Sequence, residues 1–328
     1  MTNATVTATR AALPRRSVVV LLAVALGAAA TAAFASPVQV AQATLDGARF
    51  GLVIALSGVG LSLIFATTGL FNFAHGEFVT FGAILAWLCN VMLGLPLTLA
   101  AAVAVIGGAA AGASVEYGIW RPLRRHGVGL VAAIVVSIGL AMFTRHLFLF
   151  FFHGQSRSYR EYTVQQAWHL LGVQLLPKDL VTMLVALAAL AALGIFLKRS
   201  RTGQAVRATA DDPDLSQASG IATDRVVLLV WSLGGALAAL GGVVLALDDQ
   251  VSWDMGFRVL LLVIAGVTLG GLGTVRGAIA GGLIIGVVTQ LSTLWAPSEL
   301  KYVFALIALV AILIFRPQGI FGRAQRIG

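Results

Sequence analysis

The feature that most constrains this chain is a series of apolar runs, each long enough or nearly long enough to cross a lipid bilayer as a helix. A run of about 20 apolar residues spans the hydrocarbon core as a helix, because its backbone groups are then hydrogen-bonded within the segment. Ten runs occur, at 17–35, 50–70, 78–95, 97–116, 128–151, 179–197, 226–247, 258–274, 277–296 and 301–315. They predict an all-α, polytopic membrane helical bundle of about 8–10 transmembrane helices.

Composition supports this prediction and narrows the chemistry that the chain can perform. Hydrophobic residues make up 59% of the chain and charged residues only 11%, whereas soluble domains carry about 25% charged residues. The single cysteine, Cys89, excludes an internal disulfide and any multi-cysteine metal site. The five histidines show no paired spacing for a metal, so we expect neither a metal site nor a catalytic constellation.

The basic residues predict the orientation of the chain in the membrane. If all ten runs span, 15 of the 22 lysines and arginines fall on one side. Cytoplasmic loops carry an excess of such residues, so both termini are predicted to be cytoplasmic. The same distribution accounts for the net charge of +9, so no nucleic-acid partner is expected.

The first apolar run has two interpretations, which the residues leave open. Arg15 and Arg16 precede it, and it ends in "A-A-F-A-S-P", a small-residue pattern that would suit signal cleavage after Ala35. The alternative is an additional, uncleaved transmembrane helix. We treat residues 1–43 as an N-terminal extension that contains this one apolar segment.

A polar break lies between the second and third runs. The stretch "T-T-G-L-F-N-F-A-H-G-E-F", residues 67–78, places Asn72, His75 and Glu77 within six positions. In one interpretation, Asn72 caps a helix that begins near Phe73 and Glu77 lies in its first turns. In the other, the helix breaks inside the protein, and the three side chains face a substrate pathway.

The runs also divide into two sets of five, which predicts an inverted repeat. An odd number of spans in each half gives the halves opposite topology, a common arrangement in transporters. The break "F-N-F-A-H-G-E-F" after the second run has a counterpart after the seventh, "Q-V-S-W-D-M-G-F" at 250–257. Both place polar residues, an aromatic residue and a glycine before the next apolar run.

The long connection at 198–225 is predicted to lie in the cytoplasm and to contain short helices. Asp212 suits an N-cap, Pro213 the first helical position, and Gly220 the residue just past the helix end. These signals predict a helix over 213–219, and residues 203–210 are a candidate for another. Such a capped helix outside the membrane has the properties of a docking element.

The chain carries no ATP-binding loop of its own. A P-loop requires the pattern G-x-x-x-x-G-K-[ST], and none of the three lysines, Lys178, Lys198 and Lys301, follows a glycine. If ATP drives this protein, a partner must bind it. Arg145, in the apolar stretch "T-R-H-L-F-L-F-F-F", is expected to extend toward the external interface.

Four separate motifs give the chain a resemblance to a known family. They are "N-F-A-H-G-E" at 72–77, "A-D-D-P-D-L-S-Q-A-S-G-I-A-T-D-R-V" at 210–226, "L-G-G-L-G-T-V-R-G-A-I-A-G-G" at 269–282 and "R-P-Q-G-I-F-G-R" at 316–323. In this order they resemble the permease subunits of branched-chain amino acid ABC importers. The resemblance covers residues 44–323, which would form the permease domain, and leaves 324–328 as a cytoplasmic tail.

The resemblance implies a multi-pass subunit of a bacterial inner membrane. Its partners would be a second related permease, two ATP-binding subunits, an extracytoplasmic substrate-binding protein and membrane lipid. Nucleotide would be bound only by the partners. Arg207, Asp211, Asp212 and Gly220 match the loop that couples such permeases to the ATPase. Related permeases carry urea and short amides, which is one alternative; a stand-alone carrier or channel is another.

Overall fold

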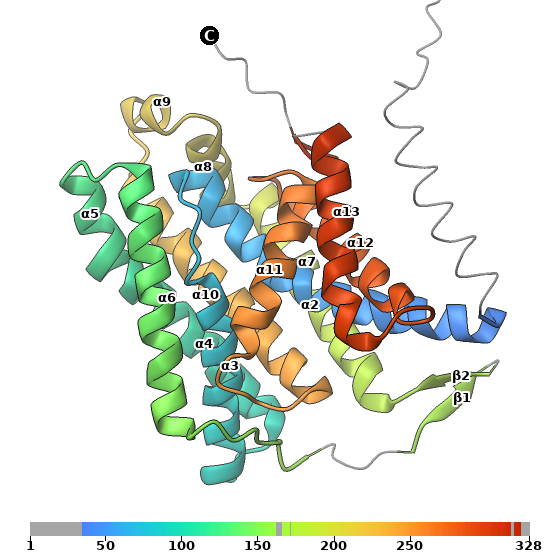
Figure 1. Cartoon of the computed structure of the whole chain (residues 1–328). Helices are drawn as coiled ribbons and strands as arrows, with labels where there is room; N and C mark the ends of the chain where they lie inside the picture. The colour runs from blue at the N-terminus through green and yellow to red at the C-terminus, as the bar shows by residue number, and fades with distance from the viewer. Residues whose placement is uncertain (1–34, 162–165, 171, 316–317, 323–328) are drawn as a thin grey trace, which may run out of the picture.

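The computed structural model describes residues 35–161, 166–170, 172–315 and 318–322, and they are largely helical (Figure 1). The helices are α2 (Pro37–Thr68), α3 (His75–Trp87), α4 (Leu97–Val115), α5 (Arg121–Arg125), α6 (Leu130–Phe152), α7 (Pro177–Arg199), α8 (Arg201–Asp211), α9 (Pro213–Ala218), α10 (Thr223–Asp248), α11 (Met255–Gly270), α12 (Val275–Ser292) and α13 (Lys301–Phe315). Short π-helical or 3-10 turns are η1 (Leu88–Met92), η2 (Glu116–Trp120) and η3 (Ser298–Leu300), and β1 (Trp168–Leu170) pairs antiparallel with β2 (Val173–Leu175).

The predicted all-α membrane bundle is confirmed. Within the described ranges, six helices are long and apolar enough to cross a membrane: α2, α4 with its extension to Arg125, α6, α7, α10 and α12. The apolar helices α11 and α13 are shorter. Each predicted run from residue 50 onward lies largely within a helix. The first run lies outside the described residues except for its last position, so both of its interpretations stay predictions.

Helix α2 begins at Pro37, well before the predicted start near residue 50. The side chain of Ser36 accepts a hydrogen bond from the Gln39 amide at 3.3 Å, and the Gln39 side chain accepts one from the Ser36 amide at 2.8 Å. This capping box with proline at the first position is a strong helix start. The apolar pattern missed it because the first turns of α2 are mixed in polarity.

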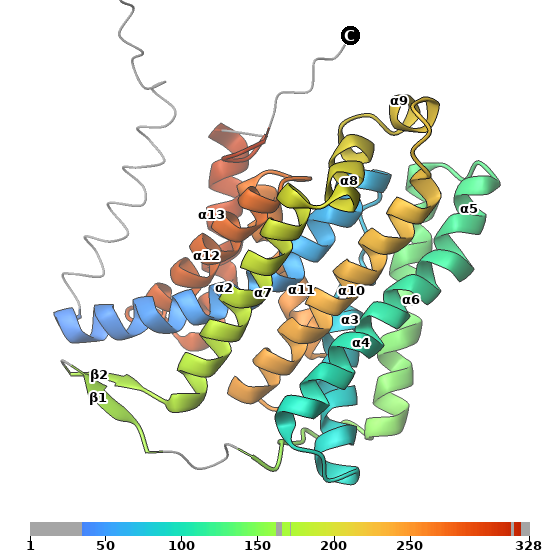
Figure 2. The same cartoon turned by 180° about the vertical axis from the view of Figure 1, so that it is seen from behind.

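The helix packing has the pattern expected of an inverted repeat. Helix α2 lies along α12, and α10 lies along α4, while Figures 1 and 2 show α2 and α10 running in opposite directions. At one crossing Gly51 lies against Gly282 and Gly286, and at the other Gly235 lies against Gly108 and Gly112. Both crossings therefore pair one glycine with two glycines spaced four apart, so the backbones approach closely.

The two ends of the bundle carry different elements. Helices α5, α8 and α9 lie at one end together with the C-terminal end of α13, and the β1–β2 hairpin lies at the opposite end (Figure 2). At the hairpin end the segment after α6 is held to the α10–α11 connection. Arg157 and Val251 exchange two backbone hydrogen bonds there, at 2.9 and 2.7 Å.

Candidate functional site

The polar break predicted at 67–78 lies between α2 and α3. After Gly69 the chain leaves α2 and runs without helical structure back into the bundle, so that α3 begins inside the protein (Figure 1). The helix starts at His75 with Ala74 as its N-cap, and Ala74 makes no side-chain capping bond. Asn72 Oδ1 accepts only the Ala74 amide, at 3.0 Å. The Asn72 side chain thus caps the turn of Phe73 and Ala74 that leads into α3, and both the capping and the pathway interpretations of this break stay predictions.

The structure buries Asn72, His75 and Glu77 in the protein interior. Their exposed fractions are 0%, 0% and 4%. The Nε2–H of His75 donates to the Ser57 carbonyl of α2 at 2.9 Å. Among the described residues, no hydrogen-bond partner is found for Asn72 Nδ2, for His75 Nδ1 or for either Glu77 carboxylate oxygen. A buried polar atom without a partner costs about 1–3 kcal/mol of folding free energy. Each of these atoms can therefore still form a favourable hydrogen bond.

The two breaks of the repeat meet at the centre of the bundle. A Cβ placed on Gly76 would lie 2.7 Å from the Gly256 carbonyl, and one placed on Gly256 would lie 1.9 Å from the Gly76 carbonyl. Only glycine fits both positions. The Gly256 amide at the start of α11 donates to Thr80 Oγ1 of α3 at 3.0 Å. The first turns of α3 and α11 are therefore in backbone contact.

Arg145 of α6 contacts α11, and its expected extension toward the external interface stays a prediction. Its guanidinium lies over the Phe257 ring of α11, 4.1 Å from the ring centre, and its Nε is buried without a hydrogen-bond partner. The attraction between a cation and an aromatic face holds it there. Arg145 and Asp254 are the charged groups with the largest electrostatic influence on Glu77. An arginine on α6 thus belongs to the surroundings of the central break.

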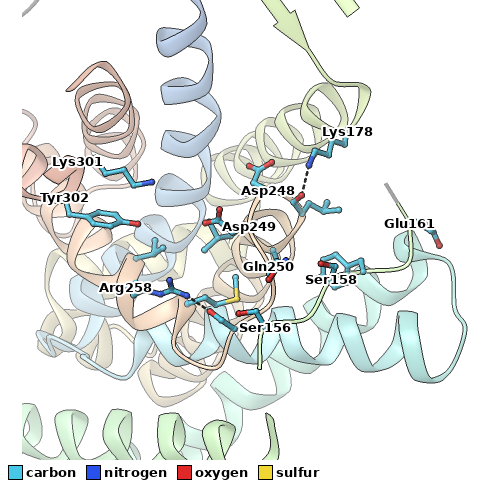
Figure 3. A pocket seen from close by; sticks show the side chains of 17 residues that line it. Ser156, Ser158, Glu161, Lys178, Asp248, Asp249, Gln250, Arg258, Lys301 and Tyr302 are labelled. Carbon is cyan, nitrogen blue, oxygen red and sulfur yellow. Dashed lines mark hydrogen bonds between the residues drawn. The ribbon is translucent and has the colours of Figure 1, made fainter. Parts of the chain in front are cut away.

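A cavity of about 740 Å³ opens at the hairpin end of the bundle (Figure 3). Its walls come from the segment after α6, the start of α7, the α10–α11 connection and the start of α13. The polar and charged lining residues are Ser156, Ser158, Tyr159, Glu161, Lys178, Asp248, Asp249, Gln250, Ser252, Arg258, Lys301 and Tyr302. No local pattern in the sequence indicates this cavity, because its lining comes from four separate segments between residues 156 and 302.

The short helices predicted in the 198–225 connection are present. Asp212 Oδ1 accepts the Leu215 amide at 2.9 Å at the start of α9, and Gly220 has a positive φ of 84° just past its end. Helix α8 turns Gly203, Val206 and Thr209 inward. The predicted helices over 213–219 and 203–210 are therefore confirmed as α9 and α8.

The four residues matched to the coupling loop all lie on the outer surface of α8–α9. Arg207, Asp211, Asp212 and Gly220 are exposed. Leu215 lies beside them with 64% of its surface exposed, and sequence analysis did not select it. The signal was available, since Leu215 is the one large apolar residue of α9. An apolar side chain among polar ones on a capped helix is a feature of docking surfaces.

Ion pairs connect α10, the helix after α9, to the neighbouring helices. Asp224 in its first turn accepts from Arg121 at 2.6 Å and from Arg125 at 3.1 Å, both on α5. Arg124 pairs in turn with the buried Glu116 of η2. These pairs tie the start of α10, which follows α9 in the chain, to α5 and η2.

The sequence of this chain matches a known protein family over most of its length. The family of the "Branched-chain amino acid transport system / permease component" matches residues 43–313. The chain belongs to this family. It is 30% identical over 298 residues to the LivH permease of Escherichia coli K12, covering 87% of this chain and 96% of LivH. It is 28% identical over 302 residues to BraD of Pseudomonas aeruginosa, with the same two coverages.

A second type of relative is also found. The LivM permease of Escherichia coli K12 is 25% identical over 314 residues, which cover 88% of this chain and 72% of LivM. LivH, BraD and LivM are each named as a permease protein of a high-affinity branched-chain amino acid transport system. The family membership confirms the resemblance inferred from the four motifs, and it makes the chain a multi-pass transport component.

Proposed function

We propose that this chain is the transmembrane permease subunit of an ABC importer that carries branched-chain amino acids across the inner membrane of a bacterium. The observation that carries the proposal is the family match over residues 43–313, which contains the polar break, α8–α9 and most of every described span. The relatives named for branched-chain amino acids are matched over nearly their full length. This favours the same substrate class here.

The energy for transport comes from partners in this proposal. The printed sequence has no P-loop, so two ATP-binding subunits would bind and hydrolyse ATP, and the chain itself is not an enzyme. The exposed surface of α8–α9, formed by Arg207, Asp211, Asp212, Leu215 and Gly220, would seat in the ATPase. The ion pairs of Asp224 would then pass its motion to α10 and α5.

The remaining partners follow from the same assembly. A second permease would complete the membrane part, which agrees with the similarity of this chain to both LivH and LivM. A substrate-binding protein would deliver the ligand from outside. Asn72, His75 and Glu77 would face the substrate pathway where α3 begins, because their buried, unpaired atoms can exchange partners as the pathway opens.

The orientation places α5, α8 and α9 in the cytoplasm, with both termini on that side. The support is that the basic residues gather on this side of the predicted topology. Reporter fusions at residues 124 and 205 should report a cytoplasmic location, and a fusion at 165 should report the outside. A reversal at any of the three positions would refute the orientation.

The decisive experiment replaces residues 212–220 with a Gly/Ser linker. Co-purification of the ATPase should be lost, while membrane insertion, measured by protease protection, should be intact. Within α9, Leu215→Ser should weaken ATPase association, whereas Gln217→Ser at an exposed polar position is the matched control. Retained ATPase association in the linker variant would contradict the proposal. Uptake by the chain alone in liposomes would favour a stand-alone carrier.

A further inference from the structure

The cavity at the hairpin end combines charges of both signs with an apolar floor. Its polar wall carries Lys301 and Asp249, and Figure 3 shows Lys301 entering from the start of α13 and Asp249 from the end of α10. Its floor is formed by Leu245, Met255 and Val259, whose exposed fractions are 3%, 3% and 4%. This combination matches a small molecule with separate charged and aliphatic parts.

Other charged groups of the wall are already engaged. Asp248 pairs with Arg49 at 3.3 Å, and Arg258 contacts Asp254 at 3.2 Å. Lys178 donates to the Leu247 carbonyl at 2.8 Å. These contacts hold the walls in place and leave less of their charge for a ligand.

Lys301 and Asp249 differ from the engaged groups. Within the residues that the structure describes, Lys301 contacts the adjacent Tyr302 ring at 5.2 Å and forms no ion pair. Asp249 makes no side-chain hydrogen bond or ion pair within the described parts of the chain. One cation and one anion without ion-pair partners therefore line the same cavity, which is the complement of a zwitterion.

We propose that this cavity is a receiving site for a free α-amino acid with an aliphatic side chain. The carboxylate pairs with Lys301, the ammonium group pairs with Asp249, and the side chain lies on the Leu245–Met255–Val259 floor. The inference rests on the proposed function and deepens it. Urea or a short neutral amide carries no charge and would leave Lys301 and Asp249 without partners, so the site selects against the substrates of the alternative permeases.

The position of the floor connects this site to the central break. Met255 is the first residue of α11 and is followed by Gly256, which contacts Gly76 at the start of α3. A ligand on the floor is thus one residue away from the crossing where His75 and Glu77 lie. The cavity therefore borders the crossing of the two breaks through Met255, which lines it.

The test measures ligand binding to the assembled transporter complex in lipid nanodiscs without the binding protein. Saturation-transfer NMR titrations use leucine, leucinamide, which lacks the carboxylate, and 4-methylpentanoate, which lacks the ammonium group. Lys301→Gln should lower the affinity for leucine and for 4-methylpentanoate about tenfold and leave the affinity for leucinamide unchanged. Asp249→Asn should weaken leucine and leucinamide about tenfold and spare 4-methylpentanoate, since each removes one charge-assisted contact.

Two further variants separate local recognition from general effects. Lys301→Arg keeps the charge and should retain leucine affinity within about twofold. Arg160→Gln removes one positive charge from the same end of the bundle, outside the cavity lining, and should change none of the three affinities. A folding defect would lower the affinity for all three ligands together. The proposal instead requires Lys301→Gln and Asp249→Asn each to leave the affinity for one ligand unchanged.

The outcomes distinguish this site from the proposed function. No measurable leucine binding, equal binding of urea and leucine, or no change in the Lys301 and Asp249 variants would overturn the receiving site. Weakening by Arg160→Gln as strong as by Lys301→Gln would do the same. ATP-dependent leucine uptake by the complete wild-type transporter tests the function separately. If uptake is normal but the variants show no ligand-specific change in affinity, only the receiving site is refuted. If the wild-type transporter shows no uptake, the proposed function is refuted.

Discussion

The α2–α3 break and the α10–α11 break occupy equivalent places in the two halves of the bundle. Each follows a long spanning helix, and each leads into a shorter helix whose second residue is a glycine, Gly76 or Gly256. These glycines are in backbone contact, and the two halves run in opposite directions (Figure 1). The backbone plan is therefore nearly the same on both sides of the crossing.

The chemistry of the two breaks differs. At the first break, His75 and Glu77 are buried and keep polar atoms without protein partners. At the second, Arg258 contacts both Ser252 and Asp254, and the group borders the hairpin-end cavity. The two breaks therefore share a backbone plan that agrees with the predicted inverted repeat, while one break is buried with unpaired polar atoms and the other borders a cavity and is paired.

The largest expected effect comes from disrupting the contact that the two breaks share. In Gly256→Leu, the new side chain would begin 1.9 Å from the Gly76 carbonyl and 2.6 Å from Thr80 Oγ1. The backbones must then separate, and we expect a loss of about 3 kcal/mol or more of folding free energy. Thermal unfolding of the purified protein measures this. Gly139→Leu on α6 is the control, because no atom lies within 4 Å of its added Cβ.

A second prediction tests whether the unpaired carboxylate of the first break has a transport role. Glu77→Ala should lower ATP-dependent uptake about tenfold or more while the unfolding temperature changes little, since Glu77 makes no protein hydrogen bond that the variant would lose. Asp254→Asn at the second break is the comparison and should lower uptake less. Near-normal uptake in Glu77→Ala would mean that the first break is only structural.

The smallest effect is expected for the exposed pair of the second break. The Arg258 side chain is 55% exposed, and its contact with Asp254 is an i,i+4 pair. Arg258→Gln should therefore change the free energy of unfolding by about 0.5 kcal/mol or less. Arg49→Gln should cost more, because Arg49 is only 20% exposed and contacts both Asp179 and Asp248. If denaturant unfolding gave the same change in unfolding free energy for Arg258→Gln and Arg49→Gln, the expected difference between the exposed and the buried ion pair would be contradicted.

Local signals in the sequence predicted the helices well. The apolar runs predicted the spans, and Asp212, Pro213 and Gly220 predicted α9 almost to the residue. The start of α2 was missed, although "S-P-V-Q" at 36–39 was visible as a capping box. Signals that act over a single turn can be read from the chain, provided that caps are weighed together with hydropathy.

Contacts between distant segments could not be predicted in this way. The contact of Arg145 with the Phe257 ring joins two different helices, α6 and α11, and no local pattern indicates it. Glu77 was selected as a candidate, yet nothing local showed that both of its oxygens lack protein partners. Lys301 and Asp249 gave no signal at all, since a lone charge near a span end is ordinary.

The sequence by itself determined the membrane class, the spans, the short helices α8 and α9 and the position of both breaks, because these depend on hydropathy and on backbone bonds within a few residues. The tertiary structure decided that Gly76 and Gly256 touch, that one break is dry, and that Lys301 and Asp249 share a cavity with an apolar floor. Those properties depend on which helices pack together, and burial and charge pairing arise only from that packing.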